Sequence, residues 1–186
     1  MNITELTNYK NYFKCLEDDL FETARYAEPL GQEDVYSFEY FKIIMLACSE
    51  VETLLKIICR FIDNNKYPKT IKQYAEIFLK RFPKIIEVEV NVSRICKTIK
   101  PFEDWTIDKC MKWWDEHQDI KHHRHTDFKK ATYKNAMYSL AGLYVLLLYL
   151  FEISDEDVRF ESKYFYHTSA SQALYVAGDG KLSDFE

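Results

Sequence analysis

Glycine and proline are scarce in this sequence, whose 186 residues contain only four of each. Proteins built entirely from β-strands need many tight turns, in which glycine and proline predominate. Their scarcity therefore argues against an all-β fold and favours helices. The aromatic share of 16%, by contrast, is high, and a hydrophobic content of 47% is sufficient for a core. At this length we expect one folded domain.

The sequence also lacks the motifs of several enzyme classes. It contains no G-x-x-x-x-G-K-[ST] phosphate loop and no G-x-S-x-G nucleophile turn. Its five cysteines are scattered without a C-x-x-C pair, which is typical of thiols used as small core residues in a reducing compartment. His123 and His125 have an H-x-H spacing, but no H-E-x-x-H motif or second Cys/His pair accompanies it. We therefore expect no metal site and no cofactor.

Sixteen consecutive uncharged residues, 136–151, raise the question of a membrane span. A span needs about 20 apolar residues, and a serine and three tyrosines dilute this run. We therefore expect a buried helix of a bundle and no membrane partner. Residues 1–6 lack the basic and then apolar order of a signal peptide, which together with the scattered cysteines predicts a cytoplasmic protein.

Apolar residues at steps of three and four predict a mainly α-helical fold. The expected helices cover residues 4–26, 37–65, 70–82, about 106 or 108 to 117, and 127–153, with Ser37 capping the second. Between the fourth and fifth helices we expect a bend, or the first turns of the last helix. The alternating, β-branched residues 85–92 predict a strand that either pairs near 96–99 or lies extended across the bundle. The predicted organisation is a bundle domain over 1–153, with a β insertion at about 85–100, and an irregular acidic tail over 154–186.

Four of the five histidines fall within nine residues, 117–125. Histidine exchanges protons near neutral pH, and lysine or arginine can hold a phosphate beside it. Although the whole chain has a net charge of −5, residues 121–134 contain five Lys or Arg and one Asp. Cleavage of RNA without a metal requires only one or two histidines and a cation. Spacing and charge leave two interpretations open, RNA chemistry or the solvated polar start of a helix.

Several stretches around this cluster occur in a characteristic order. They are Lys100-Pro101-Phe102-Glu103-Asp104-Trp105, Trp113-Trp114, Ile120-Lys121-His122-His123-Arg124, Phe128, Ala131, Asn135, Leu140-Ala141 and Leu143. This order resembles that of uncharacterised bacterial HEPN-like proteins, in which a W-x-x-Y-N-x-x-K-H-x-R segment precedes a terminal apolar helix, and residues 47–56 resemble an earlier helix of the same pattern. The likeness covers about residues 36–152.

The resemblance implies a four- or five-helix bundle, with a small β hairpin or extended insertion in this chain, and often a homodimer. Active members are metal-independent ribonucleases of toxin–antitoxin, abortive-infection and CRISPR-linked defence. Their site combines an arginine, a following polar residue and a histidine four to six intervening residues later, with two copies forming one composite site. In this chain His117 stands five positions before His122, where the family has arginine, and Gln118 occupies the polar position.

Two functions follow from the resemblance. In a ribonuclease, His122 would be the general acid or base, His117 the second proton-transfer group, and Arg124 a phosphate clamp. Without cleavage, the protein would be an RNA-binding, scaffold or regulatory protein with a partner from a defence or toxin–antitoxin operon. The expected RNA- and phosphate-binding residues are Lys121, His123 and Lys129. In a protein that does not cleave, a pseudo-site of His117, Lys121, His122 and Arg124 would still bind phosphate. Trp113 and Trp114 offer faces for base stacking, although buried core indoles are the commoner case.

Overall fold

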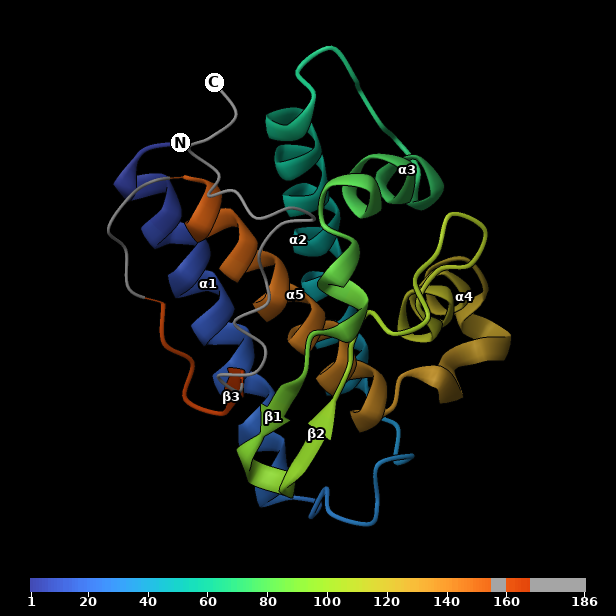
Figure 1. Cartoon of the computed structure of the whole chain (residues 1–186). Helices are drawn as coiled ribbons and strands as arrows, with labels where there is room; N and C mark the ends of the chain where they lie inside the picture. The colour runs from blue at the N-terminus through green and yellow to red at the C-terminus, as the bar shows by residue number, and fades with distance from the viewer. Residues whose placement is uncertain (155–159, 168–186) are drawn as a thin grey trace.

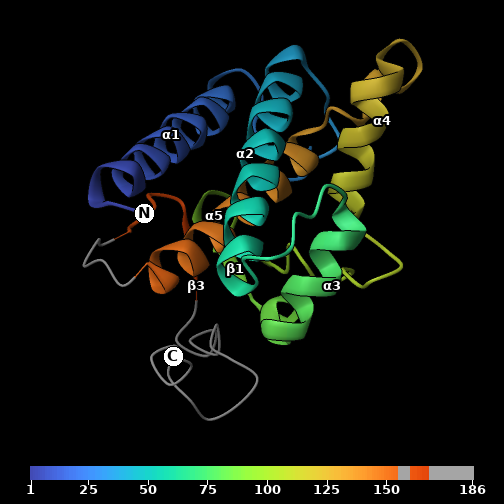
Figure 2. The same ribbon diagram turned by 90° about the horizontal axis from the view of Figure 1, so that it is seen from above.

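An apolar helix, α5 (Tyr133–Ile153), runs through the centre of the computed structural model, which describes residues 1–154 and 160–167. Its mean hydropathy of 1.7 over a membrane-length window would suit a span, but 83% of that window is buried inside the protein, consistent with the core helix of a soluble protein. Helices α1 (Ile3–Glu22), α2 (Phe38–Ile62) and α4 (Lys112–Asp127) pack against it, and α3 (Ile71–Arg81) packs on α2 (Figure 1). Figure 2 shows α2 between α1 and α4, with α5 passing behind it. The predicted helical bundle is confirmed.

Polar side chains fix the starts of the first three helices. Asn2 and Glu5 form a reciprocal capping box at α1. The Ser37 hydroxyl accepts a hydrogen bond from the N–H of Tyr40 at 3.1 Å, which confirms the predicted cap of α2. Thr70 begins α3 in the same way. These helices therefore form where both the apolar spacing and the caps indicate them.

The β insertion forms the predicted hairpin but is shorter than expected. Residues 83–87 adopt a 3-10 turn, so the strand predicted over 85–92 is wrong in its first half. Strand β1 (Val90–Val92) pairs antiparallel with β2 (Lys97–Ile99), with Val90 opposite Ile99. A 3-10 turn that begins at Pro83 can bury Ile85 as a strand would, which explains why the alternation misled the prediction.

A third strand lies in the segment predicted to be an irregular tail. Strand β3 (Phe165–His167) pairs antiparallel with the other edge of β1, giving the order β2-β1-β3. It is held by Glu17 of α1, whose side chain is buried and accepts hydrogen bonds from the Ser162 hydroxyl and the N–H groups of Lys163 and Tyr164. Three residues are too few for a detectable alternation, and their partners are distant in the sequence. The rest of that prediction, residues 155–159 and 168–186, lies outside the described residues.

The fourth helix differs from its predicted position. It does not start at Thr106, whose hydroxyl instead accepts hydrogen bonds within a turn from the N–H groups of Asp108 and Lys109. Helix α4 starts after Met111 and includes the entire histidine cluster, with a kink at His123, where φ is −130° and ψ is 37°. A 3-10 turn over 128–130 follows, so α5 starts at Tyr133 rather than near 127. The predicted bend is therefore a kink inside a helix.

Candidate functional site

Helix α4 divides the histidine cluster between the core and the surface. His117 is 4% exposed and its ring centroid lies 5.3 Å from that of Trp114. Burial, and next the charge of Lys121, lower the pKa of His117 to about 4. The side chain is therefore neutral at pH 7 and belongs to the packing of α4 against its neighbours.

The later residues of the cluster lie on the surface. Lys121, His122, His123, Arg124 and His125 are all exposed. The rings of His122 and His123 have centroids 6.5 Å apart. The guanidinium carbon of Arg124 lies 5.5 Å from the centre of the Phe41 ring on α2, within the range of a cation–π contact. The structure thus separates the buried His117 from Lys121, His122, His123 and Arg124, the other predicted site residues of α4, which are exposed.

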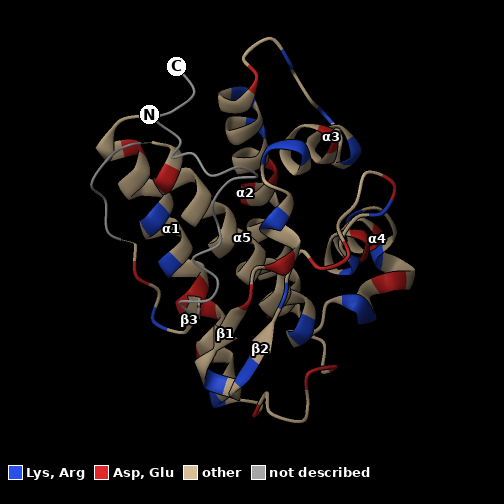
Figure 3. Ribbon diagram, viewed as in Figure 1, with Lys and Arg blue, Asp and Glu red and all other residues tan. Residues whose placement is uncertain are grey.

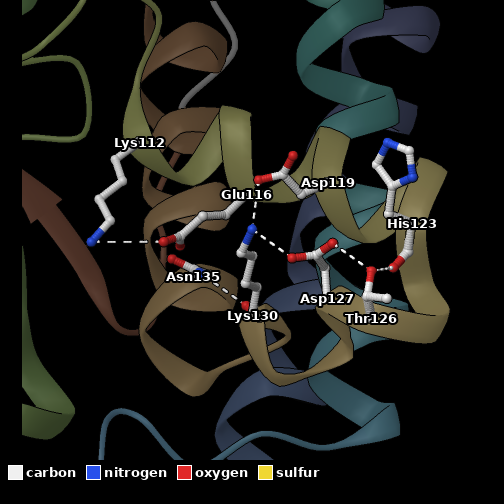
Figure 4. Close-up of polar contacts among 8 residues, drawn as sticks. All are labelled: Lys112, Glu116, Asp119, His123, Thr126, Asp127, Lys130 and Asn135. Atoms are coloured by element: carbon white, nitrogen blue, oxygen red, sulfur yellow. Dashed lines mark hydrogen bonds and ion pairs between the residues drawn. The ribbon is translucent and has the colours of Figure 1, made fainter.

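One lysine binds the two carboxylates of this region. The Nζ of Lys130 lies 2.8 Å from Asp119 Oδ2 and 2.7 Å from Asp127 Oδ1 (Figure 4). Asp127 also lies 2.9 Å from the Thr126 hydroxyl, and the hydrogen bond with Lys130 is the main cause of its lowered pKa. Because Asp119 and Asp127 both pair with Lys130, neither of them pairs with another lysine or arginine of this region.

The remaining cations of this region form no ion pair with a carboxylate within the part of the chain that the structure describes. They are Lys121, Arg124, Lys129 and Lys134, and residues 117–134 contain five Lys or Arg against two Asp, a local charge of +3 with neutral histidines. We call Lys121, Arg124 and Lys129 the cationic row. All three side chains are exposed, so the row can meet a polyanion without first breaking an ion pair.

Exposed aromatic side chains lie beside the cationic row, and the sequence did not reveal them. Phe38 is 72% exposed and Tyr36 is 45% exposed. Both contact the ring of Phe128, with centroids 4.7 and 5.8 Å away, and Phe41 lies 6.2 Å from the same ring. We call these four residues the aromatic platform. Arg124 joins it to the cationic row through its contact with Phe41.

The platform is assembled from two loops that are far apart in the sequence. The segment before α2 and the segment before α5 form an antiparallel bridge at Tyr36 and Thr132, and the Ser37 N–H donates to Ala131 O at 3.1 Å. In the sequence the only sign of the platform is the aromatic density of residues 36–41, which the helical pattern partly assigns to the core. Its exposure depends on tertiary packing.

The tryptophans considered for base stacking lie in the core. Trp113 is 3% exposed and Trp114 is 4% exposed. The Trp113 indole N–H donates to Pro101 O at 2.7 Å, and its ring covers Gly142 of α5. Both indoles therefore stabilise the contact of α4 with the bundle, whereas the aromatic platform presents exposed rings beside Arg124.

A cleft of about 350 Å³ opens beside the cationic row, and we call it the lysine cleft. The loop after β2, the start of α4 and the start of α5 form its walls. Lys129 belongs both to the row and to the cleft, whereas Lys121 faces another hollow, of about 380 Å³, with Gln118 and Tyr74. The lysine cleft is lined by Asp34, Lys100, Pro101, Glu103, Asp104, Met111, Lys112, Trp113, Glu116, Lys129, Lys130, Thr132, Lys134, Asn135 and Tyr138.

The chemistry of the site has to be read from its own residues. No family model matches the sequence, and no curated protein and no solved structure matches it either. The surface combines cations that can hold phosphates, aromatic rings that can stack bases, and the exposed imidazoles of His122, His123 and His125.

Proposed function

We propose that this protein binds single-stranded RNA across the cationic row and the aromatic platform. The observation that carries the proposal is the contact of Arg124 with Phe41, because it brings an unpaired cation against a ring that also contacts Phe128 of the aromatic platform. Cations hold the phosphates, and flat rings stack bases that have no pairing partner. Stacking requires unpaired bases, so a single strand suits the surface better than a duplex.

Binding without cleavage is the form of this function that we favour. His117, which stands where HEPN-like ribonucleases have arginine, is buried and neutral, so it contributes no charge to a phosphate. The resemblance to that family supports RNA as the ligand. It also leads us to propose a cytoplasmic homodimer that works with a protein partner from a bacterial defence or toxin–antitoxin operon.

A metal-independent endoribonuclease is the second candidate, and the exposed His122 and His123 favour it. With ring centroids 6.5 Å apart, they offer two proton-transfer groups next to Arg124. His122 would take the proton of the 2′-hydroxyl and Arg124 would hold the phosphate. The second proton-transfer group would then be His123, or a histidine of a second copy, rather than the buried His117.

Fluorescence anisotropy with a labelled single-stranded RNA tests the binding proposal. Phe38→Ser removes the most exposed ring of the platform without changing the charge, and we expect RNA affinity to fall about tenfold, since stacking contributes about 1–3 kcal/mol per base. Phe61→Ser is the matched control, because Phe61 is 60% exposed at the other end of the same helix. Equal losses in both variants, or none in Phe38→Ser, would contradict a platform that stacks bases.

Incubation of single-stranded RNA with the protein in EDTA separates the two candidates. We expect the RNA to remain intact while it is bound. Cleavage that is lost in His122→Ala and kept in His125→Ala would instead establish the ribonuclease. A mass measurement on the same sample tests the homodimer.

A further inference from the structure

The lysine cleft has the size of a small-ligand site and opens onto the proposed RNA surface. Its volume of about 350 Å³ lies at the lower end of the range for small-molecule pockets, too small for a duplex and suited to one nucleotide. Lys129 connects the cleft to the cationic row. A strand lying along the row would therefore pass the mouth of the cleft.

Most of the charges that line the cleft are already paired. Lys112 pairs with Glu116 at 3.7 Å, Lys100 with Glu89 at 3.4 Å, and Lys130 with its two aspartates. Two cations remain without a carboxylate partner in the described ranges, 1–154 and 160–167, and these are Lys129 and Lys134. They are the groups of the cleft that are free to bind a phosphate.

The first N–H groups of α5 cannot replace these lysines. Helix N-termini bind phosphates through free N–H groups. Here the N–H of Tyr133 donates to Val35 O at 3.0 Å, and that of Lys134 donates to Glu33 O at 2.9 Å. The third, on Asn135, donates to the hydroxyl of Thr132 at 3.2 Å. A phosphate at this end of the cleft therefore depends on lysine side chains.

Hydrogen-bond acceptors line the cleft beyond the lysines. Asn135 is 7% exposed, and its Nδ2 donates to Lys130 O at 2.6 Å, which leaves its Oδ1 without a partner in the described part of the chain. The carboxylate of Glu103 likewise forms no ion pair there. The pKa of the Tyr138 phenol is raised, mainly by burial and next by the charge of the Glu103 carboxylate. The Asn135 oxygen and the Glu103 carboxylate can accept hydrogen bonds from the amino groups of adenine, cytosine and guanine, which uracil lacks.

We infer that the lysine cleft receives one unstacked nucleotide of a bound RNA and prefers bases that carry an amino group. The phosphate lies at Lys129 and Lys134, and the base lies against Asn135, Tyr138 and Glu103. This inference rests on the proposed RNA binding, and it adds a base preference that the aromatic platform alone would not give, because every base has a face that can stack.

Competition among three ten-nucleotide RNAs tests the inference. One is all uridine, and the others carry a single central adenosine or cytidine. We expect the wild-type protein to bind the two substituted RNAs about five- to tenfold more tightly than the uridine RNA, the lower part of the range for base discrimination by good hydrogen bonds. Glu103→Gln should lower the ratio of the affinity for the substituted RNAs to the affinity for the uridine RNA, because the amino group loses its charged acceptor. Glu87→Gln is the matched control, because Glu87 is exposed and lies outside the cleft.

The outcomes distinguish failure of the inference from failure of the proposed function. Binding of all three RNAs with equal affinity, or a preference that Glu103→Gln leaves intact, overturns the nucleotide cleft while RNA binding stands. If no RNA binds, the proposed function fails, and titration with adenosine and cytidine monophosphate then decides about the cleft. If a monophosphate binds, and if Lys134→Gln weakens that binding while Lys14→Gln does not, the cleft remains a nucleotide site. Absence of such binding overturns it.

Discussion

His117 shows at the scale of one residue how burial changes what a histidine can do. Four histidines lie close together on α4, yet only His117 is buried, next to Trp114. A charged imidazole would lose its hydration there, so the neutral form is stabilised. The same side chain that looks like a proton-transfer group in the sequence is part of the packing in the fold.

The pKa of His117 predicts a stability that falls in acid. It is about 4 in the folded protein against an ordinary value of 6.5, so between these values the unfolded chain binds a proton that the folded protein does not. The free energy of unfolding should therefore fall as the pH drops from about 6.5 to 4, by up to about 3 kcal/mol from this residue. Urea unfolding at a series of pH values measures it.

His117→Gln should flatten that part of the pH profile, while His125→Gln, a change at an exposed histidine of the same helix, should leave it as in the wild type. Identical profiles for the wild type and His117→Gln would show that the proton uptake occurs elsewhere.

At the scale of elements, α4 and α5 meet where the smallest residue faces the largest. A Cβ added to Gly142 would lie 2.8 Å from Cζ2 of Trp113. The indole cannot easily withdraw, because its N–H donates to Pro101 O and its ring is buried. Glycine is therefore required in the middle of α5 despite its poor helix propensity.

Gly142→Ala should destabilise the protein by about 1–3 kcal/mol, the usual cost of overpacking, although alanine is the better helix former by about 1 kcal/mol. Thermal or urea unfolding measures the change. In a Trp113→Phe background the smaller ring relieves the clash, so the same alanine should then cost less. A stabilising Gly142→Ala in the wild type would contradict the contact.

Glu17 controls the attachment of β3 to the bundle. Glu17→Ala removes a buried carboxylate that accepts hydrogen bonds from the Ser162 hydroxyl and from the N–H groups of Lys163 and Tyr164, and should destabilise the fold by about 2–4 kcal/mol, because hydrogen bonds to a charged acceptor are lost together. Hydrogen exchange of β3 should accelerate as well. Asp18→Ala is the control: Asp18 is an exposed neighbour that pairs with Lys163 at 3.6 Å, and losing such a surface pair should cost less than about 1 kcal/mol.

At the scale of the whole molecule, charges of both signs are distributed over most elements (Figure 3). The net charge of −5 disfavours general adhesion to polyanions, so the RNA binding that we propose would depend on a local surface. That surface exists because Lys130 binds both aspartates of its region and leaves the cationic row unpaired. The distribution of ion pairs therefore matters more here than the total charge.

Salt should weaken RNA binding in proportion to the number of cations in contact with phosphate. For three contacts, the logarithm of the binding constant should fall with the logarithm of salt concentration with a slope of about −2, since each contact on a single strand adds about 0.7. Lys129→Gln should reduce the slope by about 0.7. Lys14→Gln, at an exposed position of α1, should not. A slope independent of Lys129 would remove it from the RNA surface.

The sequence by itself determined most of the helices, the cap at Ser37 and the burial of α5, because these depend on local spacing and apolar content. It also indicated the hairpin. It did not indicate the 3-10 turn over 83–87, because such a turn gives the same apolar alternation as a strand. Nor did it indicate the start of α4, because a polar residue such as Thr106 can cap a turn as well as a helix. Strand β3 was missed because its partner, β1, lies more than seventy residues earlier in the chain.

The candidate site was only partly predictable. The histidine cluster directed attention to α4, which carries part of the candidate surface, since composition alone marks a polar segment there. Only the tertiary structure decided that His117 turns inward, that Tyr36 and Phe38 stay exposed beside Arg124, and that Lys130 neutralises Asp119 and Asp127. Burial and ion pairing are properties of distant segments brought together, and a local pattern of residues cannot specify them.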